Sequence, residues 1–206
     1  MKKIVYIDFD DVLCETAQVL AQIINTEFNK NVSFEQIDSF DLTKSFDLDN
    51  KESTALFEMF HKADVLMRLP PIEGALDTLH QWQSKGIQIH IVTGRPPETA
   101  QISQEWLTIN GFTPDRISFV DKYNRGHTAV AGVDTLSLTE LQQLPFALAI
   151  DDSPIAITFL LESMTMPVIV FDRPWNISLA NEQNQPRITR CRTWQEINTC
   201  TQNLLF

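Results

Sequence analysis

The sequence lacks the features that mark secreted, zinc-binding or membrane-spanning proteins. Its three cysteines, Cys14, Cys191 and Cys200, are an odd number without metal-ligand spacing, which argues against a disulfide framework or a zinc site. The apolar run near the start is broken by Asp8 too soon for a signal peptide, and no later run approaches membrane-spanning length. Internal repeats and low-complexity tracts are also absent. We therefore expect a soluble, cytoplasmic protein that does not contact a membrane.

Positive charge is scarce as well. The chain has 16 lysines and arginines against 27 acidic residues, so its formal net charge is -11. An acidic surface does not attract a nucleic-acid polymer or an anionic membrane, and we expect neither as a partner. A small phosphorylated substrate is compatible with this charge if local cations and a metal offset the field. Lysine is especially sparse after position 85, where Lys122 is the only one.

The hydrophobic pattern predicts an α/β fold. With 206 residues, 43% of them hydrophobic, the chain can bury one core plus a small accessory unit. Segments with helical periodicity, such as 75–85 and 98–110, alternate with apolar, β-rich runs. This alternation predicts a doubly wound parallel sheet that binds its ligands at the carboxyl ends of the strands. The predicted strands are residues 3–9, 87–92, 116–120, 146–150 and 167–171.

The segment from residue 15 to residue 68 differs from the rest. It has no convincing strand, and its apolar residues recur at helical spacing. We expect a small helical cap inserted after the first strand, with residues 1–14 and 69–206 forming the core domain.

The first predicted strand ends in three carboxylates, Asp8, Asp10 and Asp11. Carboxylates are depleted from strands, so a strand that ends in them indicates a site. Because side chains alternate along a strand, Asp8 and Asp10 point to one place, where they could hold a divalent cation or divide nucleophilic and acid/base work. The alternative is a solvated strand end.

Three further motifs follow the other predicted strands. Thr93-Gly94-Arg95 offers a hydroxyl, a flexible turn and a cation that suit a phosphoryl group, although an ordinary turn would look the same. Asp151-Asp152 would repel each other unless they share a cation with Asp8, and their alternative role is helix capping.

The ammonium of Lys122 could offset a carboxylate and a phosphate. Arg125 and His127 compete with Lys122 for that role, and a solvated loop lysine is the alternative.

The order of these motifs and their places at strand ends resemble the haloacid dehalogenase (HAD) superfamily. Within it, residues 171–176 and the short helical insertion look most like the 5'(3')-deoxyribonucleotidase-like phosphatases. The resemblance implies a Rossmann-like core and a Mg²⁺-dependent phosphomonoesterase, with a nucleotide among the candidate substrates. The motifs that carry it are Asp8-x-Asp10, Thr93-Gly94, Lys122 and Asp151-Asp152.

The resemblance also implies a role for each residue. Asp8 would be the nucleophile that forms an aspartyl-phosphate, and Asp10 the acid/base whose backbone carbonyl also binds the metal. Asp8, Asp10 and Asp152 would be the metal ligands, with Asp151 in support. Thr93, Gly94 and Lys122 would bind the phosphoryl oxygens, with Arg95 and Arg125 as further support.

The resemblance leaves the substrate and some alternatives open. The cap phenylalanines could stack a nucleobase, although in so small a unit we expect most of them in the core. Arg173, Trp175 and Asn176 could line the rim of the site or simply close the sheet edge. A phosphate-binding regulatory protein and a phosphotransferase or mutase are the rival functions. The phenylalanines concerned are Phe34, Phe40, Phe46, Phe57 and Phe60.

Overall fold

The computed structural model describes residues 2–205, apart from the side chains of residues 42 and 180–184, around a seven-stranded sheet. The strands lie in the order β4-β3-β2-β1-β5-β6-β7, and each neighbouring pair is parallel. The doubly wound parallel sheet that the sequence predicts is therefore confirmed. The strands are β1 (Ile4–Ile7), β2 (Gln88–Thr93), β3 (Arg116–Val120), β4 (Thr135–Leu136), β5 (Phe146–Asp151), β6 (Val168–Phe171) and β7 (Ile188–Cys191).

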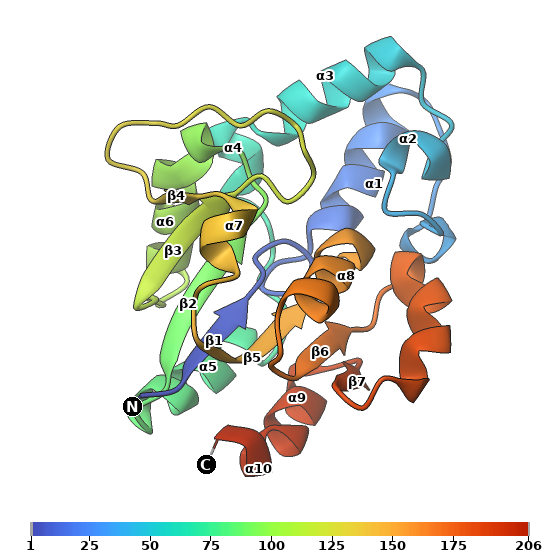
Figure 1. Ribbon diagram of the computed structural model, residues 1–206. Coiled ribbons are helices and arrows are strands. Elements are labelled where there is room, and N and C mark those ends of the chain that lie inside the picture. The colour runs from blue at the N-terminus through green and yellow to red at the C-terminus, as the bar shows by residue number, and fades with distance from the viewer. Residues whose placement is uncertain (1, 206) are drawn as a thin grey trace.

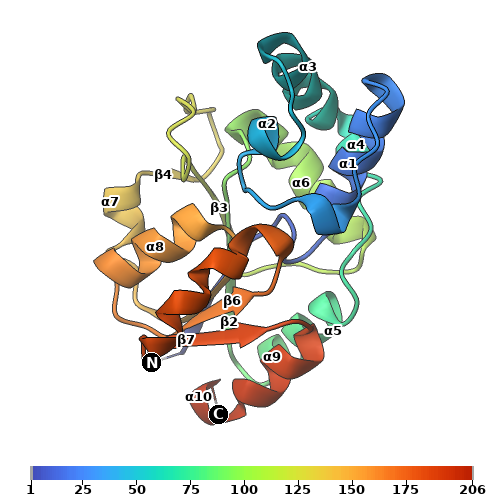
Figure 2. The ribbon, with the colours of Figure 1, turned by 90° about the vertical axis from the view of Figure 1, so that its right-hand side faces the viewer.

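Helices cover both faces of the sheet, as Figures 1 and 2 show. The central strand β1 explains how, because its successive side chains point to opposite faces. Val5 and Ile7 belong to a hydrophobic cluster with helices α5, α6 and α9, whereas Tyr6 belongs to a second cluster with α7 and α8. These helices are α5 (Ala75–Ser84), α6 (Ala100–Ile109), α7 (Leu138–Leu141), α8 (Pro154–Ser163) and α9 (Trp194–Cys200), and α10 (Gln202–Leu205) follows.

Helix starts follow the capping signals in the sequence. The Asp49 side chain accepts hydrogen bonds from the backbone N–H groups of Lys51 and Glu52 and so begins a helix. Ser153 caps α8 by accepting from the N–H of Ala156, with Pro154 in the first turn. Ser33 and Gln36 have the same three-residue spacing as Asp49 and Glu52, but they begin only a short 3-10 helix.

Two of the seven strands were not predicted. The edge strand β4 has only two residues, and β7 reads Ile-Thr-Arg-Cys, with two polar residues between its apolar ends. These strands lie at the two edges of the sheet, where edge strands are often short. Runs of two or four residues are too short to show a clear hydrophobic pattern. A long 3-10 segment, η3 (Pro174–Asn184), was also not predicted.

Residues 15–68 contain helices and no strand among the described residues, and they lie over the carboxyl ends of the strands (Figure 1). Their buried side chains, such as Leu20, Ile37 and Leu56, continue the cluster that begins at β1. The boundaries of the cap domain stay a prediction. No helix in residues 2–205 has the length and hydrophobicity needed to cross a bilayer. The elements here are α1 (Thr16–Glu27), η1 (Phe34–Gln36), α2 (Leu42–Ser45), α3 (Asn50–Phe60) and α4 (Ala63–Leu66), and η2 (Pro97–Thr99) precedes α6.

Candidate active site

Asp8 directly follows β1 and lies buried beside Lys122. The Lys122 Nζ is 2.5 Å from Asp8 Oδ1 and 3.0 Å from Asp151 Oδ2, and all three side chains are almost inaccessible to solvent. Burial raises the pKa of Asp8, and the Lys122 charge opposes that rise. Burial lowers the pKa of Lys122, but Asp151 and Asp8 outweigh it and raise this pKa. Because Lys122 faces two carboxylates, its ammonium form is the one that the pocket stabilises.

Asp151 and Asp152 follow β5 and have different partners. Both oxygens of the Asp151 carboxylate are occupied, because Oδ2 accepts from the hydroxyl of Tyr6 at 2.7 Å and from Lys122, and Oδ1 accepts from the N–H of Ser153 at 2.9 Å. Asp152 Oδ2 accepts a hydrogen bond from the indole N–H of Trp175 at 2.8 Å. The alternation of side chains along β1 places Tyr6 on the same face as Asp8, so the sequence itself contains a signal for Tyr6 as a site residue.

The acidic residues fit a hard divalent cation. Each of Asp8, Asp151 and Asp152 offers a carboxylate oxygen, and these oxygens lie within 4.8 Å of one another. Burial, followed by repulsion from Asp8, raises the pKa of Asp152 well above its usual range. Lys122 pairs with two of these buried carboxylates, Asp8 and Asp151, so a bound cation would balance the remaining negative charge. The oxygen-only donor set suits Mg²⁺. Because Asp151 already has three partners, Asp8 and Asp152 are the better placed ligands.

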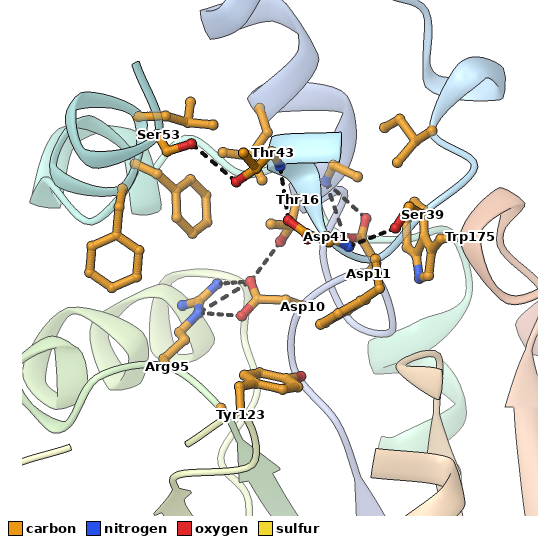
Figure 3. Close-up of a pocket in the computed structure, with 18 of the residues that line it drawn as sticks. Asp10, Asp11, Thr16, Ser39, Asp41, Thr43, Ser53, Arg95, Tyr123 and Trp175 are labelled. Carbon is orange, nitrogen blue, oxygen red and sulfur yellow. Dashed lines mark hydrogen bonds and ion pairs between the residues drawn. The ribbon is translucent and has the colours of Figure 1, made fainter. Parts of the chain in front are cut away.

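Asp10 is held by Arg95, as the dashed lines in Figure 3 show. Arg95 Nη2 lies 2.7 Å from Asp10 Oδ1, and Nε lies 2.9 Å from Oδ2. The Thr16 hydroxyl also donates a hydrogen bond to Oδ1, at 2.6 Å. Burial alone would raise the pKa of Asp10, but the Arg95 charge and these hydrogen bonds lower it. Arg95 and these hydrogen bonds therefore favour the carboxylate form of Asp10 over its acid form.

Arg95 is among the largest fully buried side chains. Its guanidinium lies 3.9 Å from the centre of the Phe9 ring, and its Nη1 donates to the Ser103 hydroxyl at 3.1 Å. The sequence suggested that Arg95 supports the phosphoryl group. The structure gives Arg95 a charged partner, Asp10, in a pairing that no sequence spacing indicated. Its support of the phosphoryl group stays a prediction.

Thr93 and Gly94 lie at the end of β2, as predicted. The buried Thr93 hydroxyl accepts a hydrogen bond from the N–H of Arg95 and so stabilises the turn. A Cβ on Gly94 would lie 2.4 Å from the ring of Tyr123. The absence of a side chain at Gly94 therefore allows Tyr123 to close against the loop, a contact that the sequence did not reveal.

The loop after β3 distinguishes the three candidate cations. The Asp121 side chain accepts from the N–H groups of Arg125, Gly126 and His127 and so closes a turn. This turn places Lys122 between Asp8 and Asp151. Arg125 lies on the cavity wall, 4.7 Å from the centre of the Tyr123 ring. The two ring nitrogens of His127 are buried and have no hydrogen-bond partner among the described residues. Neither His127 nor Lys122 is among the residues that line the cavity.

Asp11 has a structural role. Its φ of 56° lies in the left-handed region, where glycine is usual and aspartate is tolerated. Its carboxylate accepts from the N–H of Ala17 at 3.0 Å at the start of α1. Burial raises the pKa of Asp11 to about 7.

A cavity of about 520 Å³ lies between the strand ends and the cap. Asp8, Asp10 and Asp152 line its floor, and cap residues, including Thr16 and His61, line other walls. The cap phenylalanines divide between core and cavity. Phe46 is buried in the core, and Phe60 is buried but also lines the cavity. Phe40 and the half-exposed Phe57 reach the cavity as well, and Phe34 packs edge-on against Trp175.

Comparison with known proteins gives consistent matches. Residues 2–203 match the sequence model of a family described as 5' nucleotidase, deoxy (pyrimidine), cytosolic type C. A protein of Bacillus cereus named as a predicted nucleotidase is 23% identical over 193 residues, 92% of this chain and 93% of its own. A second, from Halalkalibacterium halodurans, is 25% identical over 191 residues, 91% of this chain and 90% of its own.

Solved structures agree on the fold. A HAD family hydrolase of Deinococcus radiodurans, with bound phosphate and sodium, superposes with a TM-score of 0.65 at 15% identity and covers 98% of this chain and 96% of its own. A predicted phosphoglycolate phosphatase of Haemophilus somnus gives 0.63 at 18% identity, with 98% of both chains covered. At this identity the match concerns the Rossmann-like HAD fold alone.

Proposed function

Since the chain belongs to the 5' nucleotidase, deoxy (pyrimidine), cytosolic type C family, we propose that it is a Mg²⁺-dependent phosphomonoesterase that acts through an aspartyl-phosphate on Asp8. The predicted resemblance to HAD hydrolases and the predicted enzyme class, a phosphatase, are confirmed by this membership. The metal, the covalent intermediate, the substrate and the role of each residue belong to the proposal.

In the proposed first step, an oxygen of Asp8 attacks the phosphorus atom. Because the ion pair with Arg95 favours the carboxylate form of Asp10, Asp10 would take up a proton from solvent when the substrate binds. The bond between phosphorus and the leaving oxygen then breaks, and Asp10 supplies this proton to that oxygen. In the second step, Asp10 takes a proton from a water molecule that attacks the phosphorus. The bond between phosphorus and Asp8 breaks, so that phosphate is released and both carboxylates return to their first state.

Lys122 and the metal would stabilise charge in this reaction. The Lys122 ammonium, 2.5 Å from Asp8 Oδ1, lies where negative charge on the transferring group develops. Asp8, Asp152 and the backbone carbonyl of Asp10 would hold Mg²⁺, which would supply Lewis-acid stabilisation of the phosphoryl oxygens. Thr93 and Gly94 would complete the phosphoryl site.

One observation supports this function more than any other: a buried nucleophile candidate and a second carboxylate share one cavity. Asp8 is 3% exposed and touches Lys122, while Asp10, two residues later, faces the same cavity. A protein that only binds phosphate needs the cation but not two carboxylates directed at one anion.

The cavity also supports a nucleoside monophosphate as substrate. Its volume of about 520 Å³ is within the usual range for pockets that hold small ligands. Phe40, Phe57 and Trp175 supply aromatic surface to its walls, on which a base could stack. Relatives named as predicted nucleotidases agree with that substrate class.

The test is phosphate release from nucleoside monophosphates, sugar phosphates and a generic aryl phosphate, with and without Mg²⁺. The wild type is compared with Asp8→Asn, which removes the nucleophile but keeps the size of the side chain. Release that requires Mg²⁺ and Asp8 is expected, and an undiminished rate in Asp8→Asn would contradict the proposal. A phosphorylated product that forms only when an acceptor is present would indicate a phosphotransferase. Tight binding of a phosphorylated ligand without its hydrolysis would indicate a regulatory protein.

A further inference from the structure

The segment after β6 reaches the acidic cluster. Trp175, at the start of η3, donates its indole N–H to Asp152 Oδ2 at 2.8 Å. Asn176 donates its amide to the backbone carbonyls of Asp152, at 2.9 Å, and Phe171, at 2.8 Å. These contacts fix Asp152 through both its side chain and its backbone.

This segment is itself well anchored. Asn176 is fully buried, and its Oδ1 accepts from Arg190 Nη2 at 2.7 Å. The same Arg190 nitrogen is paired with Asp172 at 2.6 Å, so β7 supports the segment from the other side. Trp175 is 5% exposed and packs edge-on against Phe34 of the cap, with ring centres 5.7 Å apart. Such burial leaves the indole few other orientations.

We propose that Trp175 is a positioning residue for the metal site: its indole N–H occupies Oδ2 of Asp152 and turns Oδ1 toward the cation shared with Asp8. This inference rests on the proposed function insofar as Asp152 is a metal ligand. A carboxylate with one oxygen held by the protein binds a cation through the other with less loss of rotational freedom. Neither the family match nor the sequence motifs assign Trp175 this role.

The test compares two matched tryptophan variants. Trp175→Phe keeps an aromatic ring and removes the hydrogen bond to Asp152. The control, Trp82→Phe, also removes a buried indole hydrogen bond, the one to Asn198 Oδ1 at 3.0 Å, but on helices α5 and α9 at the far end of the sheet from the cap (Figure 1). Dissociation constants for Mg²⁺ by calorimetry and for Mn²⁺ by electron paramagnetic resonance are measured directly, without turnover.

We expect Trp175→Phe to weaken metal binding about 10-fold or more and Trp82→Phe to leave it unchanged. The concentration of Mg²⁺ that gives half-maximal phosphate release should rise in parallel, with kcat recovered at saturating metal. Equal metal affinity in Trp175→Phe and wild type would overturn the inference, as would a wild type that binds neither metal. A wild type that binds metal and releases no phosphate would contradict the proposed function alone.

A second measurement does not depend on the folding of Trp175→Phe. The four indole N–H signals of the ¹⁵N-tryptophan-labelled wild type are assigned with Trp82→Phe, Trp106→Phe and Trp194→Phe, and Mg²⁺ is then added. The Trp175 signal should shift more than the Trp82 signal, because its acceptor is a metal ligand. A Trp175 signal that does not respond to saturating metal would overturn the inference.

Discussion

The guanidinium of Arg95 binds both oxygens of the Asp10 carboxylate, at 2.7 and 2.9 Å. The two residues are 85 positions apart and leave adjacent strands, β1 and β2. Arg95 thereby fixes the plane of the side chain that the proposed mechanism uses as its acid and base. A planar fork can do this, whereas a single ammonium cannot.

Arg95→Lys should therefore lower turnover in a way that depends on the leaving group. Lysine keeps the charge but loses the two-point contact, so the misplaced Asp10 protonates the leaving oxygen less well. We expect a loss of about 100-fold for alkyl phosphates and a smaller loss for an activated aryl phosphate, whose leaving group needs no proton. Steady-state rates on both substrates measure the difference, and equal losses on the two would contradict the role of Arg95.

Asp151→Asn and Asp152→Asn should have different effects. Among the described residues, no donor is hydrogen-bonded to Asp152 Oδ1, and Oδ2 accepts from Trp175. Because Oδ1 could then bind a cation, we expect the substitution of Asp152 to raise the half-activating Mg²⁺ concentration by about 10-fold or more. Asp151 instead binds Lys122 and Tyr6, so its substitution should lower kcat and leave metal affinity closer to wild type. Calorimetric titration with Mg²⁺ separates the two, and the reverse order of metal affinities would show that Asp151 is the ligand.

Gly94→Ala should destabilise the fold, because the new Cβ would lie 2.4 Å from the Tyr123 ring. Overpacking of this kind costs about 1–3 kcal/mol of unfolding free energy. Tyr123→Ala in the same chain removes the clashing ring. Urea unfolding of the single and double variants gives the coupling energy. A Gly94→Ala that costs as much with Tyr123→Ala as without it would contradict the predicted contact.

His90 should make stability depend on pH. It is 3% exposed, its Nε2 lies 2.8 Å from the Ser118 hydroxyl, and burial, followed by the charge of Arg116, lowers its pKa from 6.5 to about 4. As pH falls, His90 therefore takes up its proton in the unfolded chain before it does so in the folded protein. The stability that comes from burying neutral His90 is complete above about pH 6.5 and is lost as pH falls toward 4. We expect the free energy of unfolding to fall by about 2 kcal/mol between pH 7 and pH 5 because of this residue.

His90→Gln should remove that part of the pH dependence, and His80→Gln, at an exposed histidine, is the control. Urea unfolding between pH 7 and pH 5 measures how steeply the free energy of unfolding changes with pH in each variant. An unchanged slope in His90→Gln would show that other groups cause the loss of stability in acid.

The sequence predicted the features that depend on local pattern. Apolar runs followed by carboxylates or by Thr93-Gly94 indicated strands and their ends, because strand propensity and turn chemistry are local properties. Parallel strands bring their carboxyl ends to one edge of a sheet, so the meeting of Asp8 with Asp151 and Asp152 followed from topology. The strands β4 and β7 escaped prediction because edge pairing leaves little trace in so few residues.

The three-dimensional fold selects, from several similar side chains, the one that meets each partner. Lys122, Arg125 and His127 lie within six positions of one another, and the turn closed by Asp121 determines that Lys122 faces Asp8. Arg95 pairs with Asp10, and Trp175 reaches Asp152, across separations that no sequence period encodes. Long-range contacts depend on how loops close over a finished sheet. Local sequence patterns thus indicated five of the seven strands and the polar residues at their ends, whereas the long-range pairings of these residues depend on how the finished chain packs.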